Sequence, residues 1–220
     1  MIFFFADNHY GAHPGRYIFS ALPESLQKQI KFYEDDLQAL ENTQWQDDCS
    51  LLVLHWIGGT CGVEHPNIQA EKQVRSYLER GGNMLLLHGA TAAFWQWSWW
   101  RKIVGFRWVR AADPDGVAPS EHPVKPYNVN VCNVQHRLAS ILQNMSLPED
   151  EIYIQLEHVS PALVLMESVI DNKTFPQCWE TQTPWGGKLI GFLPGHRKAA
   201  IDQINLSGNI NKLITFLLEK

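Results

Sequence analysis

The stretch Gly81-Gly82-Asn83-Met84-Leu85-Leu86-Leu87-His88-Gly89-Ala90 indicates the fold more clearly than any other part of the chain. Its double glycine is typical of a helix end, and the apolar run that follows predicts a short buried strand, Met84–Leu87. The run stops at His88, before two small residues. Because ligands of open α/β sheets bind beyond the carboxyl ends of the strands, this histidine is well placed for chemistry.

The residues on either side extend the pattern. Asn67–Arg80 predicts an amphipathic helix, and Leu51–Trp56 before it predicts a strand. Strand–helix–strand order favours parallel pairing with a right-handed crossover. Much later, Leu189–His196 repeats the plan, because it reads as an apolar strand that ends at Gly-His.

Further segments complete an α/β pattern. The other expected strands are Ile2–Ala6, Ile30–Tyr33, Asn128–Cys132, Ile152–Leu156, Ala162–Glu167, Gln177–Glu180 and Lys188–Leu193. The other expected helices are Arg16–Leu26, interrupted at Pro23, then Thr91–Val104, His136–Gln143 and Asn209–Leu218. A helix through Asp36–Leu40 competes with the strand Ile30–Tyr33. We therefore expect a single domain over residues 1–220, with a mostly parallel sheet and helices on both faces.

Composition excludes several classes of function. The net charge of the 220 residues is −5, so no basic surface attracts nucleic acid. No apolar run approaches the ~20 residues that span a bilayer, and the first residues do not resemble a signal peptide. The 4 cysteines form no C-x-x-C pair. We expect a cytoplasmic protein with reduced thiols.

Histidines carry most of the functional signal. His88 and His196 each follow a predicted strand, where the neutral imidazole is a general base or a metal ligand. Glu121 and His122 lie in a polar loop, and adjacent side chains of an extended chain point opposite ways, which favours His122 alone. His9, in the loop after the first strand, is a candidate for substrate or metal contact. Each of these histidines also has a purely structural interpretation.

Two other features invite a functional interpretation. The four tryptophans between Trp95 and Trp100 suggest a sugar-stacking wall, although such clusters more often form a core or a dimer face. Trp179 and Trp185 are better stacking candidates, because we expect both in loops near His196. Cys61, between glycines, partly imitates a nucleophile elbow, but a free cysteine is more often a small packing residue.

The order of these motifs resembles the ThuA-like family, named after a protein of trehalose utilisation. The resemblance rests on Gly81-Gly82 with Leu87–Ala90, on Glu121–Pro123, Asp150–Tyr153 and Gly195-His196, and on Trp179 before the last motif. It covers about residues 50–200. The N-terminal third matches loosely, and Val134-Gln135-His136-Arg137 keeps a family histidine without the proline that often follows it.

The resemblance implies the flavodoxin-like, three-layer α/β/α fold of class I glutamine amidotransferases. It also implies that the Asp150–Tyr153 segment lines the cleft, which favours Glu151 as the inward carboxylate and Tyr153 as a substrate contact. His88 occupies the elbow where an amidotransferase carries its cysteine nucleophile. An imidazole forms no thioester, so glutaminase activity is not expected.

The leading hypothesis is an enzyme of carbohydrate metabolism that acts on a small sugar or keto-sugar. His88, His122, Glu151 and His196 would act as acids and bases, or several of them would hold Zn²⁺ or another divalent ion. One alternative is a sugar-binding or scaffold protein without turnover. Another is a Cys61-dependent hydrolase or amidotransferase. Homo-oligomerisation also remains open.

Overall fold

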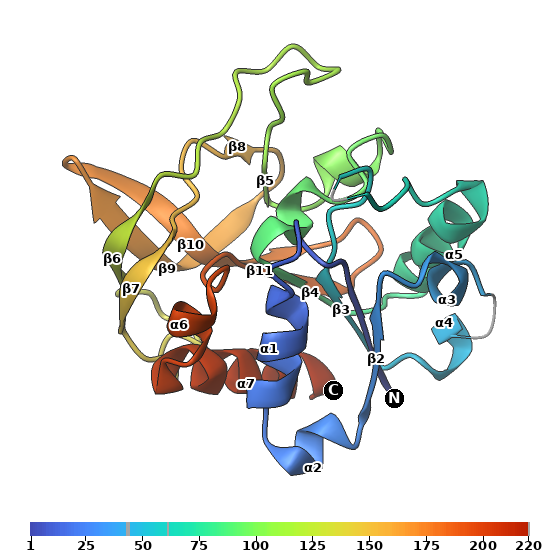
Figure 1. Cartoon of the computed structure of the whole chain (residues 1–220), viewed down its shortest axis with the longest axis horizontal. Helices are drawn as coiled ribbons and strands as arrows, with labels where there is room; N and C mark the ends of the chain where they lie inside the picture. Colours follow the sequence, from blue (N-terminus) through green and yellow to red (C-terminus); the bar gives the residue numbers. More distant parts are fainter. Residues whose placement is uncertain (43–44, 61, 220) are drawn as a thin grey trace.

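The computed structural model describes residues 1–42, 45–60 and 62–219. In these residues a mixed sheet of nine strands runs in the order β2-β1-β3-β4-β11-β10-β9-β6-β7 (Figure 1). Its strands are β1 (Ile2–Ala6), β2 (Ile30–Glu34), β3 (Leu51–His55), β4 (Met84–Leu87), β6 (Val124–Val131), β7 (Met145–Glu151), β9 (Ala162–Ile170), β10 (Lys173–Gln182) and β11 (Lys188–Phe192). A small second sheet pairs β5 (Phe106–Arg107) with β8 (Glu157–His158).

The sheet has a parallel half and an antiparallel half. Strands β2, β1, β3, β4 and β11 pair in parallel. Strands β10, β9, β6 and β7 extend the sheet by antiparallel pairing. Two such reversals restore direction, so β9 and β7 run the same way as β11. The carboxyl ends of β1, β3, β4, β11 and β7 therefore lie along one edge.

Helices cover both faces of the sheet. Their bounds are α1 (Pro14–Ala21), α2 (Glu24–Gln27), α3 (Leu37–Glu41), α4 (Trp45–Asp48), α5 (Ile68–Glu79), α6 (Lys198–Ile201) and α7 (Ile204–Leu218), with short 3₁₀ turns η1 (His88–Ala92) and η2 (Trp100–Lys102). Side chains of α1, α6 and α7 share one buried cluster, and those of α3, α4 and α5 share the other. Strand β1 feeds both clusters, because Phe4 and Phe5 point to opposite faces.

This architecture confirms the expected α/β fold with a parallel core. Strand β4 has its predicted bounds, and α5 begins after Asn67, whose side chain accepts the N–H groups of Gln69 and Ala70. Strand β2 and the competing helix α3 both form, because Asp36 caps α3 through the N–H of Ala39. The antiparallel half of the sheet was not expected from the sequence, since strand–helix–strand order, which predicts parallel pairing, occurs only in the first half of the chain.

Three expected elements are wrong. Thr91–Val104 forms no α-helix, because Phe94 has φ 50° and stacks on Trp97 at 4.0 Å between ring centroids, so core packing overrides local propensity. His136–Gln143 forms only turns. The strand expected at Ile152–Leu156 lies earlier, as β7, and Gln155 with φ 58° interrupts any continuation.

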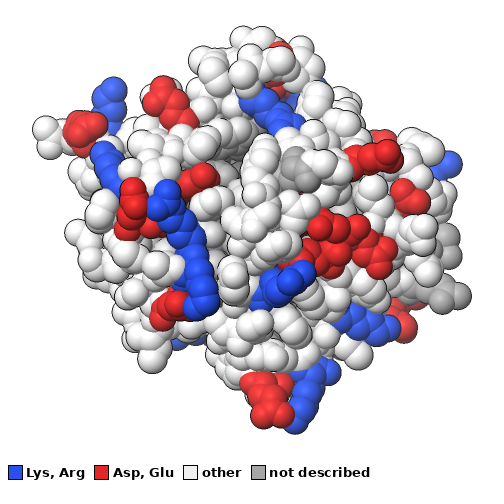
Figure 2. All heavy atoms as spheres, in the orientation of Figure 1, with Lys and Arg blue, Asp and Glu red and all other residues white. Residues whose placement is uncertain are grey.

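The outer surface carries mixed charge. Figure 2 shows lysine and arginine side chains interspersed with acidic ones over one face of the molecule. No helix in the described part of the chain is long and apolar enough to cross a membrane.

Candidate active site

Titratable side chains gather where the parallel strands end. His55 is the last residue of β3, Glu151 the last residue of β7, and His88 follows β4 directly. The loops after β1 and β11 supply Asp7 with His9, and His196. His122 precedes β6, whose first residue Val124 pairs with Glu151. One edge of the sheet thus collects groups from six separate segments of the sequence.

His88 lies at a strained turn in the centre of this group. Its backbone has φ 48°, in the left-handed region that residues other than glycine rarely adopt. The Nδ1 atom lies 2.8 Å from the carbonyl oxygen of Leu193, which only accepts, so Nδ1 carries the hydrogen. Nε2 of the neutral ring therefore keeps a lone pair, and the hydroxyl of Tyr153 donates to it at 3.2 Å.

Glu151 is the carboxylate shared by three imidazoles. Its Oε2 lies 3.3 Å from Nε2 of His88. Its Oε1 lies 3.5 Å from Nδ1 of His122 and 3.8 Å from Nε2 of His196. Burial disfavours the charged form of Glu151, but the hydrogen bond and charge of His88 and the charges of His196 and His122 outweigh it and lower its pKa to about 2.

Three of the histidines at this edge, His9, His55 and His196, have pKa values shifted toward the neutral form. Burial, followed by the charges of His88 and His196, lowers the pKa of His9 to about 3. Burial also lowers the pKa of His55 well below its usual value and that of His196 in the same direction. Neutral imidazoles around one ionised carboxylate present lone pairs rather than charges, which is the state that binds metal ions.

The loop that carries His196 is held by Asp150. This buried carboxylate accepts the backbone N–H groups of Gly195, His196 and Arg197, at 3.0, 3.1 and 2.8 Å. Of these two neighbouring acids, only Glu151 was predicted from the sequence as a site residue. Adjacent residues of β7 point to opposite sides, so Glu151 faces the histidines while Asp150 positions the loop after β11.

Asp7, His9 and His55 form a deeper group behind His88. All three are buried, and one ligand atom from each lies within 4.8 Å of the others. Sequence reasoning missed His55, because Leu51–Trp56 was interpreted only as a strand. The signal was present, since His55 ends its strand and a double glycine, Gly58-Gly59, follows three residues later.

A pocket of about 130 Å³ opens onto these residues. Its lining residues are His9, Tyr10, Ile57, Ala92, Trp108, Arg110, His122, Glu151 and Tyr153. Trp108 forms an aromatic wall, with its ring 4.5 Å from that of Tyr153 and 5.2 Å from that of His122. Glu121 lies apart from the lining and is exposed, and the amide of Gln155 donates to its carboxylate.

Trp179 and Trp185 do not line this pocket, which corrects the expectation from sequence. Trp179 lies within β10 and is fully buried, with its indole N–H donating to the carbonyl of Val104 at 2.9 Å. Trp185 precedes β11 and therefore lies at the opposite edge of the sheet, where it packs against Trp99. Neither ring is available for stacking under a sugar at His196.

The tryptophans between residues 95 and 100 divide between core and periphery. Trp97 and Trp100 are buried, while Trp95 and Trp99 are partly exposed. Trp95 stacks with the Arg110 guanidinium, 5.3 Å from the ring centroid, and Arg110 lines the pocket, so this contact connects the cluster to the pocket.

Cys61, the rival nucleophile, lies outside the described residues. Burial raises the pKa of Cys49 and of Cys132 to about 11, and it raises the pKa of Cys178 further. None of these three thiols is activated as a thiolate.

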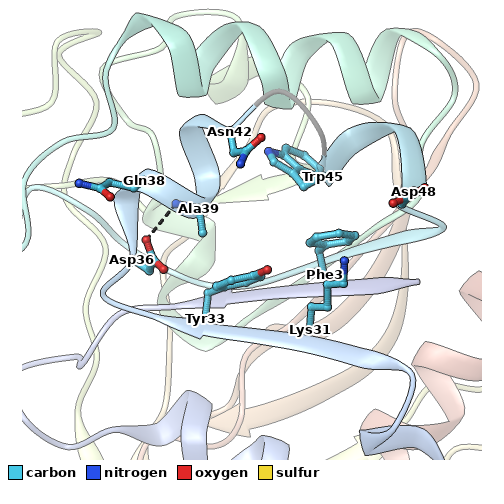
Figure 3. A pocket seen from close by; sticks show the side chains of 9 residues that line it. All are labelled: Phe3, Lys31, Tyr33, Asp36, Gln38, Ala39, Asn42, Trp45 and Asp48. Carbon is cyan, nitrogen blue, oxygen red and sulfur yellow. Dashed lines mark hydrogen bonds between the residues drawn. The ribbon is translucent and has the colours of Figure 1, made fainter.

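A separate hollow of about 370 Å³ lies against β2 (Figure 3). The side chains of Phe3, Tyr33 and Trp45 line it, and Lys31 lies over the ring of Phe3. No histidine or cysteine lines it among the described residues, and the carboxylate of Asp36 is engaged in capping α3. The acid–base chemistry therefore concentrates at the other site.

Two overlapping groups at the sheet edge have the geometry of metal sites. His9, His88, Glu151 and His196 bring one ligand atom each within 4.8 Å of one another, and so do Asp7, His9 and His55. Imidazole with carboxylate is a donor set that Zn²⁺ and other first-row divalent ions accept.

Comparisons with known proteins point to one family. The family model for ThuA, described as trehalose utilisation, matches residues 9–214. A search of curated proteins found no match.

The structure is also similar to solved structures. A ThuA-like protein of Parabacteroides merdae has a TM-score of 0.79 at 13% identity, over 99% of this chain and 88% of that one. A ThuA-like protein of Bacteroides uniformis has a TM-score of 0.67 at 15% identity, over 99% and 89%. A cytoplasmic protein of Salmonella typhimurium has a TM-score of 0.62 at 12% identity, over 99% of both chains. These likenesses show the fold.

Proposed function

Because the chain belongs to the ThuA family, we propose that it is an enzyme of carbohydrate metabolism that acts on a small sugar or keto-sugar with a divalent cation, best matched by Zn²⁺. The cation site proposed here consists of His88, Glu151 and His196 and is called the outer site. Three protein ligands with an open position are typical of catalytic zinc. We place the protein in the cytoplasm.

The observation that carries the proposal is a pair of acceptors facing each other. Nε2 of His88 has a lone pair, because Nδ1 donates to Leu193, and it lies 3.3 Å from an oxygen of the ionised Glu151. Two acceptors at this distance repel, and a positive charge between them, either a proton on Nε2 or a divalent cation, removes that repulsion. A divalent cation supplies that charge and also meets the neutral ring of His196.

The chain's own groups divide the remaining work. A bound cation would polarise a hydroxyl or carbonyl oxygen of the substrate. His122 stands at the mouth of the pocket, with half of its side chain exposed, where it can exchange protons with solvent. Trp108 and Tyr153 present aromatic surface and a hydroxyl to the sugar. The backbone of His88 stays in its strained conformation because the contacts around it in the site hold it there.

The test measures cation content and sugar chemistry together. The purified protein is incubated with aldoses, ketoses and keto-sugars in D₂O and followed by ¹H NMR, before and after chelation and return of Zn²⁺. We expect turnover or deuterium exchange that chelation abolishes and Zn²⁺ restores. His196→Asn and Glu151→Gln should lose turnover and the cation of the outer site, whereas His136→Asn, whose ring pairs with Glu180 elsewhere, should keep both.

The aromatic lining also favours a second candidate, a sugar-binding protein without turnover. Tyr10, Trp108 and Tyr153 give the pocket the stacking surface that sugar recognition uses. This candidate predicts sugar affinity by calorimetry that chelation leaves unchanged, together with no chemical change of any sugar. That result would replace the enzymatic proposal.

A further inference from the structure

The carboxylate of Asp7 is buried without a cationic side chain beside it. Its Oδ2 accepts the backbone N–H groups of Ile57 and Gly58 at 2.7 and 3.3 Å, and its Oδ1 accepts that of His9 at 3.2 Å. Among the described residues, the only side chain that forms an ion pair with it is His9, at 3.8 Å. A buried charge is costly unless a counter-charge lies nearby, so Asp7 calls for a positive group at this place.

His55 is buried with both ring nitrogens unsatisfied. Its exposed fraction is 0%, and neither Nδ1 nor Nε2 has a hydrogen-bond partner in the structure. The Nδ1 atom of His9, which points to Asp7, is also buried without a partner. Buried polar atoms are nearly always satisfied, so these three nitrogens mark a place where something binds.

We propose that Asp7, His9 and His55 form a second divalent-cation site, here called the inner site, with Zn²⁺ as the best-matched ion. One ligand atom from each residue lies within 4.8 Å of the others. A cation at this place would neutralise Asp7 and take a lone pair from each imidazole. His9 belongs to both groups of ligand atoms and is assigned here to the inner site, so the two sites as defined share no ligand and the inference stands independently of the proposed function.

The two sites have the same composition and lie side by side. Each offers two imidazoles and one carboxylate, a set that first-row divalent ions accept. The ring of His9 lies 5.1 Å from that of His88 and 4.9 Å from that of His196, and the ring of His55 lies 5.6 Å from that of His88. His9 also lines the pocket, which gives the inner site a path to solvent. The chain therefore carries a candidate two-cation centre.

A buried water is the competing occupant, and it differs from a cation in charge. Water would satisfy ring nitrogens by hydrogen bonds, but it would leave the charge of Asp7 without a counter-charge. Stoichiometry distinguishes the two occupants directly.

The experiment counts cations in the whole chain. Chelator-stripped protein is titrated with Zn²⁺ by calorimetry, and bound zinc is measured by elemental analysis after dialysis. We expect two equivalents in the natural chain, one in His55→Asn, one in His196→Asn and none in the double variant. His136→Asn should keep two. Co²⁺ in place of Zn²⁺ gives an absorption band for each occupied site and identifies which band His55→Asn removes.

Other outcomes separate this inference from the proposed function. A single equivalent that His196→Asn removes and His55→Asn retains would overturn the inner site and leave the outer one intact. A single equivalent with the opposite response would support the inner site and overturn the outer one. No bound cation would overturn both. If His55→Asn does not fold, Asp7→Asn and His55→Gln replace it, and retention of every bound equivalent in both of these variants would overturn the inner site.

Discussion

The backbone N–H of His196 donates to both carboxylate oxygens of Asp150, at 3.1 and 3.3 Å. Replacing Asp150 by Asn turns one of these acceptors into an amide donor that faces N–H groups. We expect the free energy of unfolding to fall by about 1–3 kcal/mol. We also expect turnover to drop as His196 loses its position. Urea unfolding and sugar turnover of the same preparation measure both effects.

Glu149 provides the matched control for Asp150. It lies in the same strand but forms an exposed ion pair with Arg197, at 2.7 Å. Glu149→Gln should change unfolding by no more than about 1 kcal/mol and leave turnover unchanged. Equal losses in the two variants would contradict the positioning role of Asp150.

The hydroxyl of Tyr153 is predicted to assist at His88. In this structure the hydroxyl of Tyr153 donates to Nε2 of His88, and a cation on Nε2 would free that hydroxyl to donate to a substrate oxygen. Tyr153→Phe removes this donor without changing the aromatic wall of the pocket. We expect turnover to fall about three- to tenfold, the equivalent of one hydrogen bond, while zinc stoichiometry is kept. Tyr33→Phe, in the hollow of Figure 3, should have no effect on turnover. A Tyr153→Phe variant with full activity would exclude this role.

Acid should destabilise the cation-free protein well before most carboxylates are protonated. The pKa of His9 is lowered to about 3 and that of His55 well below its usual 6.5, so the unfolded chain binds more protons. Each histidine contributes stability that is present above pH 6.5 and is lost as pH falls, by about 1.4 kcal/mol per pH unit.

Asp7 acts in the opposite direction. Burial raises its pKa to about 6, so its contribution to stability is present below pH 3.8 and is lost as pH rises through 6. Between pH 3.8 and 6, the effect of Asp7 on stability offsets the effect of one of the two histidines. Urea unfolding at several pH values between 7.5 and 4.5 should therefore show a net loss of stability, and His9→Asn should make the profile shallower. A flat profile in the natural chain would contradict the prediction.

Arg107 should hold the base of the loop that leads to His122. Its guanidinium, whose side chain is 4% exposed, donates to both oxygens of Asp113 at 2.7 and 3.0 Å and also pairs with Glu157. Arg107→Met leaves a buried carboxylate unpaired, so we expect a loss of about 3–5 kcal/mol and faster cleavage by Glu-C protease after the exposed Glu121. Arg75→Met, which breaks an exposed pair with Glu79, should not change cleavage there.

Cys61 is expected to be dispensable. The histidines and Glu151 supply the chemistry of the proposed enzyme, so Cys61→Ser should keep full turnover and iodoacetamide should not abolish it. Loss of turnover in Cys61→Ser, with cation content intact, would favour the hydrolase hypothesis instead.

The sequence predicted the parallel half of the fold because each of its strands is a local apolar run. The run before His88 and the helix ended by Gly81 needed no tertiary information. The antiparallel half was harder, since β7 carries Pro148 and three acids and lacks any continuous apolar pattern. Its place in the sheet depends on pairing with β6, which lies far from the parallel core.

The site was predictable where a histidine follows a strand, and less so where burial decides. His88 and His196 followed that rule, whereas His55 was hidden within a segment interpreted only as a strand. Trp179 and Trp185 were misplaced because aromatic residues near Gly-His look alike in sequence, whether they pack in a core or face a pocket. Only the register of β10 on β11 places Trp179 beside Gly191 and inside the protein.

The mixed direction of the sheet has a consequence for synthesis of the chain. Glu151 shares an edge with His88 because four antiparallel pairings in succession, from β11 through β10, β9 and β6 to β7, restore the direction of the parallel strands, and His196 follows β11, which pairs with β4. A ribosome-bound chain that has released only its first half holds His9, His55 and His88 but has no outer carboxylate. Capture of a cation by the outer residues would therefore report that β7 and β11 have both joined the sheet, and a truncated product would lack the outer cation.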